Sequence, residues 1–193
     1  MGGKFCPGDY RAIISIETAK KNITDSFPNF KINSIEYLGE GINNTTFIAN
    51  NEYVFRFVKH EEADEFIENE IAILPLITEK VELKIPEFQY KGTQKENNYK
   101  IVAYKMIKGV SLDEEIISNN IETKKQAIIQ IGFFLQQLHS IDPNEAEKAG
   151  LKHRNVYQYY LSQREDAREH LYPVIENIYP QNAVKEVSLA SFF

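Results

Sequence analysis

Alternating apolar and polar positions in the first half of the chain predict short β-strands. The segments are rich in β-branched and aromatic side chains, which favour strands. Asn50 and Asn51 predict a tight hairpin between two of them, because asparagine tolerates a positive φ. A polar loop from Gly92 to Asn98 separates the last two strands. The five predicted strands span residues 32–38, 45–49, 53–58, 87–90 and 99–106.

Helical periodicity appears before, within and after this group of strands. The first predicted helix begins at a cap on Asp9 and runs to about Asp25, and its weak apolar stripe predicts a surface position. A second helix is expected at residues 61–77. After Gly109 the pattern is helical throughout. It predicts a capping box at 111–114, a helix at 122–140 that Asp142-Pro143 stops, and a third helix at 156–171.

This order of elements predicts an α+β fold rather than a doubly wound parallel sheet. We expect a five-stranded antiparallel meander with one inserted helix, followed by a partial helical lobe. The predicted division is an N-terminal helix (1–29), a sheet lobe (30–106), an interlobe linker (107–110) and an incomplete helical lobe (111–193).

Composition narrows the classes of partner. The 193 residues contain 22 Lys and Arg against 28 Asp and Glu, a net charge of −6, whereas nucleic-acid binding relies on an excess of basic side chains. The single Cys6 excludes an internal disulfide and cannot build a zinc site alone. No apolar run approaches the ~20 residues of a membrane span. We expect a cytoplasmic protein that binds neither nucleic acid nor membrane.

Two glycines lie in the junction between the first two predicted strands. Gly39-Glu40-Gly41 does not open a helix, which excludes a Rossmann turn, and no Gly-Lys-Ser/Thr follows, which excludes a P-loop. Glycines in such a turn can let backbone N–H groups approach a phosphate. A plain hairpin turn and a phosphate-covering loop both remain open.

A cation and a carboxylate stand in apolar surroundings. Arg56 alternates with Val54 and Val58 on one face of the third strand, so it is either a snorkelling surface side chain or one held by an anion. Glu70 falls near the centre of the apolar face of the following helix, where a lone carboxylate is costly. We predict that Arg56 and Glu70 pair, while Asp64 and Glu68 are solvated charges.

Together these features resemble the nucleotide lobe of the protein-kinase-like fold, and in detail the aminoglycoside phosphotransferase family. The resemblance covers residues 30 to 142 and rests on five stretches in the family's order. They are Leu38–Thr45, Tyr53–Phe57, Asn69–Leu74, Tyr104–Gly109 and Phe134–Asp142.

The resemblance implies a role for each matching position. Arg56 takes the place of the strand lysine that holds the nucleotide phosphates, and Glu70 orients it. Val54 and Tyr104 line the purine pocket, whose edge the backbones of Lys105 and Ile107 read. The turn at Gly39, Gly41 and Asn43 covers the phosphates, and Gly109 ends the linker. The expected cofactor is ATP or GTP, and the reaction is transfer of the γ-phosphate to a hydroxyl group.

The family's catalytic loop has no counterpart in this sequence. Its His-x-Asp pattern fits none of His60, His139, His153 and His170, and the chain stops about where that loop is expected to begin. We therefore assign no catalytic residue and no metal ligand. Mg²⁺ and a small-molecule hydroxyl acceptor are expected only in a full-length form. The alternative is a non-catalytic kinase-like binding module, and in both cases the incomplete helical lobe predicts self-association.

Overall fold

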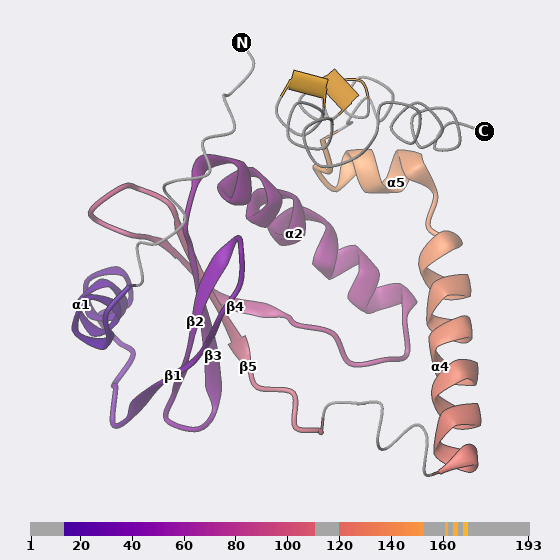
Figure 1. The fold of residues 1–193 in the computed structure, drawn as a ribbon, viewed down its shortest axis with the longest axis horizontal. Coiled ribbons are helices and arrows are strands. Elements are labelled where there is room, and N and C mark those ends of the chain that lie inside the picture. Colours follow the sequence, from indigo (N-terminus) through magenta and orange to yellow (C-terminus); the bar gives the residue numbers. More distant parts are fainter. Residues whose placement is uncertain (1–13, 111–119, 153–160, 162–163, 166–167, 170–193) are drawn as a thin grey trace, which may run out of the picture. The chain divides into compact units, whose positions relative to one another are not determined.

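The structure is a computed structural model that describes residues 14–110, 120–152, 161, 164–165 and 168–169 (Figure 1). The helices and strands all belong to one compact unit, Gly8–Lys152. In chain order they are α1 (Ile16–Ser26), β1 (Ile35–Glu40), β2 (Asn44–Ala49), β3 (Tyr53–Val58), α2 (Glu61–Lys80), β4 (Phe88–Thr93), β5 (Lys100–Lys105), α4 (Ile121–His139) and α5 (Pro143–Lys148). The capping box predicted at 111–114 and most of the helix predicted at 156–171 lie outside the described residues.

The five strands form one antiparallel sheet in the order β1-β2-β3-β5-β4, which confirms the predicted α+β fold with an inserted helix. The sheet is not a simple meander, because β5 pairs with β3 and leaves β4 at the edge. Burial explains the order. Ile101, Val102 and Ala103 of β5 are all fully buried, which suits a central strand covered on both faces, whereas β4 alternates between half-buried and exposed positions.

The tight hairpin between β2 and β3 is confirmed. Asn50 and Asn51 both have positive φ, at 57° and 52°. The Asn50 side chain also accepts hydrogen bonds from the backbone N–H groups of Asn33 and Ser34, at 2.7 and 3.1 Å. One residue type therefore makes the turn and ties it to the chain that enters β1.

Helix α1 begins later and is more deeply packed than the sequence predicted. Its N-cap is Ser15, whose side chain accepts from Thr18 N, so the predicted helix through residues 14 and 15 was wrong at its start. The predicted cap, Asp9, lies outside the described residues. The predicted surface position was also wrong in part, because Ala19 and Ile23 are fully buried against the sheet. Their partners there are three phenylalanines of β2 and β3, Phe47, Phe55 and Phe57.

Helix α2 covers the opposite face of the sheet (Figure 1). It extends three residues past the predicted end at Ile77 and continues through Pro75. Its buried side chains are Ala63 and Ile67, with Ile71 packed beside them. This stripe at i, i+4 and i+8 is rotated from the apolar face predicted by sequence, and it places Glu70 at the margin of the buried face rather than at its centre.

The helices after the sheet include one that the sequence did not predict. Helix α4 matches the predicted helix within one residue at each end. Asp142-Pro143 does end it, but Asp142 also caps the short α5, where Pro143 occupies the first turn. Many apolar side chains of α4 are exposed, among them Ile128, Ile129 and Ile131.

None of the helices that the structure describes is both long enough and apolar enough to cross a bilayer.

Candidate functional site

Arg56 lies on the face of the sheet that α2 covers. The register places it opposite Thr46 of β2 and Val102 of β5, with Val54 and Val58 on the same face of β3. A backbone in regular β pairing leaves the side chain little choice of direction, so the guanidinium points toward α2. Its side chain is 21% exposed, which leaves it accessible from one side.

Glu70 of α2 meets Arg56 in a bidentate ion pair. Nη1 of Arg56 donates to Oε2 at 2.7 Å, and Nη2 donates to Oε1 at 3.1 Å. The predicted pairing is confirmed. The geometry matches the planar fork of guanidinium to the two carboxylate oxygens, which fixes the orientation of both groups.

Two aromatic side chains complete the surroundings of the cation. The Arg56 guanidinium carbon lies 5.9 Å from the centre of the Phe88 ring, in a cation–π arrangement. The ring centres of Phe88 and Tyr104 are 6.1 Å apart. Tyr104 of β5 stands directly opposite Val54 of β3 in the sheet. Burial raises the pKa of Tyr104 above its ordinary value of 10.0, against the opposing effect of Arg56, so its phenol is protonated and can donate at neutral pH.

The glycine turn lies at the end of the same sheet. Gly39 pairs with Thr46, the residue opposite Arg56, so Gly39 faces the same side of the sheet as Arg56. A Cβ at Gly39 would meet no atom within 4 Å, and Gly39 has no positive φ. Neither packing nor backbone strain requires glycine there, whereas a ligand close to the backbone would. Gly41 N donates to Asn44 O at 2.9 Å and closes the turn around Asn43.

The predicted linker, residues 107–110, follows the end of β5 at Lys105. Lys105 pairs with Tyr53 at the last position of β5, and Met106 N donates to Glu52 O at 2.7 Å. Ile107 is 43% exposed, and a Cβ at Gly109 would meet no atom within 4 Å. The structure thus places Val54, Tyr104 and Lys105 along adjacent strands, with Arg56 two residues from Val54.

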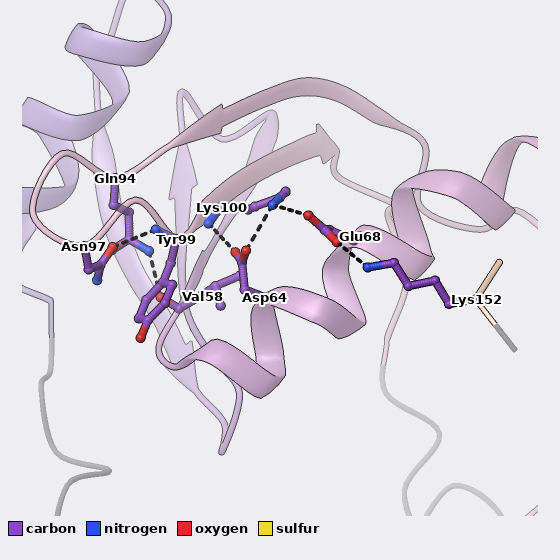
Figure 2. A network of polar contacts seen from close by, with 8 residues as sticks. All are labelled: Val58, Asp64, Glu68, Gln94, Asn97, Tyr99, Lys100 and Lys152. Carbon is purple, nitrogen blue, oxygen red and sulfur yellow. Dashed lines mark hydrogen bonds and ion pairs between the residues drawn. The ribbon is translucent and has the colours of Figure 1, made fainter. Parts of the chain in front are cut away.

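A polar network anchors α2, and sequence reasoning missed it (Figure 2). Asp64 accepts from the backbone N and from Nζ of Lys100, at 2.6 and 3.0 Å. Glu68 accepts from Nζ of Lys100 and of Lys152, each at 2.9 Å. The prediction that Asp64 and Glu68 are solvated charges was therefore wrong. The one signal in the sequence was their i, i+4 spacing on the helix, which does not reveal partners more than 30 residues away.

Lys100 and Lys152 strongly lower the pKa of the Glu68 carboxylate. Hydrogen bonds from Lys100, and then from Lys152, lower the pKa of Glu68 from 4.5 to about 2. Lys100 belongs to β5 and Lys152 follows α5, so Glu68 connects the helix that carries Glu70 to the sheet and to the chain beyond α5.

Within the described residues, no group of three His, Cys, Asp or Glu side chains is close enough to hold a metal ion. The site as described is a cation oriented by a carboxylate, flanked by aromatic rings and an open glycine turn. Such an arrangement can bind an anionic group next to a flat apolar one.

Comparison with known proteins gives concordant results. The sequence model of the phosphotransferase enzyme family (APH) matches residues 34–183. Among solved structures, the GDP and kanamycin complex of APH(2")-IIia is 26% identical with a TM-score of 0.77, and covers 89% of this chain. The ADP-bound aminoglycoside phosphotransferase APH(2'')-Ib is 25% identical with a TM-score of 0.53, and covers 66%.

This chain spans only 56% and 40% of the lengths of those two structures, respectively. The structural match identifies the sheet, its inserted helix and the helices that follow as a kinase-like fold. The family match covers more than half of the sequence, so the chain belongs to the phosphotransferase enzyme family.

Proposed function

We propose that this chain is the nucleotide-binding part of a small-molecule phosphotransferase that moves the γ-phosphate of ATP or GTP to a hydroxyl group. The observation that carries the proposal is the bidentate pair between Arg56 and Glu70. It holds a cation in a defined orientation between Val54 and Val58 of β3, where a phosphate group can bond to the remaining guanidinium donors.

The other predicted positions take roles around that cation. Val54 and Tyr104 form the apolar wall against which a purine packs, and the backbones of Lys105 and Ile107 read its edge. The turn at Gly39, Gly41 and Asn43 covers the phosphates, which can bond to backbone N–H groups that the turn does not use internally. The family membership and the relatives described as GDP and ADP complexes support this assignment.

The acceptor class follows from the relatives alone. One of them is described as a complex with kanamycin, so an aminoglycoside hydroxyl is the first acceptor to test. We propose the same division of the chain as before, with a nucleotide lobe at 30–106, a linker at 107–110, and helices at 1–29 and 111–193. A nucleotide-dependent kinase of this kind works in the cytoplasm, where ATP and GTP are supplied.

This chain supplies no residue that we assign as catalytic base or Mg²⁺ ligand, because no His in the sequence begins the family's catalytic pattern. Phosphoryl transfer depends on those groups for alignment and charge neutralisation. We therefore expect the 193-residue chain to bind nucleotide weakly and to transfer no phosphoryl group. Turnover of labelled ATP and GTP against kanamycin tests this, and steady product formation would contradict it.

Isothermal titration calorimetry with ATP and GTP, up to millimolar concentration, tests the binding proposal. We expect saturable heat with at least one nucleotide, and a loss of about tenfold in affinity in Arg56→Met, because a guanidinium–phosphate bond is removed. Lys95→Met is the matched control. It also removes one positive charge, from a surface pair with Asp25 at 3.0 Å, on a side chain that is 62% exposed. Wild-type protein that binds neither nucleotide would contradict the proposal and favour a different binding role.

A further inference from the structure

Lys59 lies directly after β3 and is almost completely buried, with 6% of its side chain exposed. Lysine is seldom buried to this degree without a partner. Its Nζ forms an ion pair with the Glu40 carboxylate and donates to the carbonyl oxygen of Gly41 at 3.3 Å. Its backbone N donates to Asn43 O at 3.0 Å. Three contacts from one residue therefore hold the glycine turn.

The strand register shows from which side Lys59 holds the turn. Glu40 stands opposite Thr45, which stands opposite Phe57, so these side chains share the face that α1 covers. Gly39 and Arg56 share the other face through Thr46. The ion pair between Lys59 and Glu40 thus lies behind the turn, and leaves the face toward Arg56 clear.

The contact with Gly41 orients one peptide group. In a trans peptide the C=O and the following N–H point in opposite directions. Because the Gly41 carbonyl accepts from Lys59 Nζ, the N–H of Ile42 points away from Lys59. Within the described residues that N–H makes no hydrogen bond. A donor held in this way suits an anionic oxygen.

We propose that Lys59 is a positioning residue for phosphate binding. It fixes the peptide between Gly41 and Ile42 so that the Ile42 N–H is presented to a phosphate oxygen of the bound nucleotide. Its positive charge also neutralises Glu40, whose carboxylate would otherwise place a negative charge in a turn that faces an anion. This inference rests on the proposed function, since it names a further residue of the same site.

The test compares a nucleoside triphosphate with its nucleoside in calorimetric titrations of Lys59→Met. The nucleoside has no phosphate, so its binding does not use the Ile42 N–H. We expect affinity for the triphosphate to fall about tenfold, and affinity for the nucleoside to change by less than about twofold. A purely structural role for Lys59 would lower the melting temperature and weaken both ligands alike.

Two further variants separate orientation from charge. Glu40→Gln removes the carboxylate but keeps the Lys59 contact with Gly41, so triphosphate affinity should stay the same or increase. The double variant Glu40→Gln/Lys59→Met leaves no carboxylate without its partner lysine, which protects folding. It should still bind the triphosphate about tenfold more weakly than wild type, because the peptide is released.

The outcomes distinguish this inference from the proposed function. Equal losses for triphosphate and nucleoside in both Lys59 variants, or no loss in either, would overturn the role of Lys59 while the nucleotide site stands. Lys95→Met should leave both affinities unchanged. Wild-type protein that binds neither ligand would overturn the proposed function, and the inference with it.

Discussion

At the Arg56–Glu70 pair, solvent exposure decides how much the ion pair contributes to stability. The Glu70 side chain is 37% exposed and that of Arg56 is 21% exposed, so water screens the attraction. The bidentate geometry and the neighbouring Phe88 ring act in the other direction. We therefore expect the pair to contribute little to the free energy of folding, and to act mainly by fixing the orientation of the Arg56 guanidinium.

A double-mutant cycle measures the coupling free energy between Arg56 and Glu70. We expect Arg56→Met and Glu70→Gln each to lower the free energy of unfolding by about 1 kcal/mol, and the coupling between them to exceed about 0.5 kcal/mol. Urea unfolding of the wild type, both single variants and the double variant provides the four values. Additive single effects would show that the two side chains do not interact in solution.

Gly92 of β4 marks a close approach between the end of α1 and the sheet. A Cβ there would lie 2.8 Å from the Phe27 ring and 2.9 Å from Ser26 Cβ. Ser26 also donates its hydroxyl to Thr93 O at 2.7 Å, which keeps the helix end in place. The absence of a side chain at this residue is what allows α1 to pack on β4.

Overpacking at this contact predicts that Gly92→Ala lowers the free energy of unfolding by about 1–3 kcal/mol. The matched control is Gly132→Ala in α4, where a Cβ meets no atom within 4 Å. That change should be neutral or raise stability by about 0.5–1 kcal/mol, since alanine favours a helix interior. Thermal unfolding of the two variants would refute the account if they shifted in the same direction.

Among the elements, α2 is the one on which the site depends, because it carries Glu70. Its buried stripe holds it on the sheet through Ala63 and Ile67. The network of Asp64 and Glu68 with Lys100 adds polar contacts on another side of the helix (Figure 2). Packing and ion pairs together fix the rotation of α2 that brings Glu70 to Arg56.

Glu68 gives this network a pH dependence. Its pKa is lowered to about 2 in the folded protein, so its stabilising effect is fully present above the unfolded value near 4.5, and is lost as pH falls toward 2. We expect Glu68→Gln to lower stability at pH 7 by less than about 1 kcal/mol, because 40% of the side chain is exposed.

Chemical denaturation between pH 7 and pH 2 checks the sign. The difference between wild type and Glu68→Gln should shrink across the window from about 4.5 to about 2. Glu79→Gln, at an exposed position near the end of the same helix, is the control for the removal of one carboxylate from α2. A stability difference between wild type and Glu68→Gln that is the same at all pH values would contradict a lowered pKa of Glu68.

Local patterns predicted most elements well, and long-range partners only in part. Alternation predicted β3 to the residue, and the apolar surroundings of Arg56 and Glu70 predicted their pairing. The edge position of β4 could not be predicted, because it depends on which strand β5 joins. The role of Lys100 was missed for the same reason. Lys100 lies 32 residues from Glu68 in the sequence, and the fold rather than a local pattern brings the two together.

At the scale of the whole molecule, α4 is the element whose packing is least complete in the described residues. Ile128 is 61% exposed and Ile131 is 52% exposed, three residues apart on the helix. The APH(2")-IIia structure is longer than this chain, which spans 56% of its length. We propose that this apolar surface causes self-association of the 193-residue chain.

Replacing both side chains tests that proposal. The double variant Ile128→Glu/Ile131→Glu should shift the protein toward a monomer in light scattering, because it removes the apolar contact and adds repulsion. Gln130→Glu, which adds charge at an exposed polar position, should leave the mass unchanged. A wild-type chain that is monomeric at all concentrations would remove the case for association.

The most direct test of the nucleotide site is to map the backbone amide signals by NMR while ATP or GTP is added. The account predicts that the largest shifts cluster at residues 39–43, at Arg56 and at 104–107, with small shifts on the exposed face of α4. Shifts that cluster away from these three segments, or none at millimolar nucleotide, would contradict the central claim that this face of the sheet binds nucleotide.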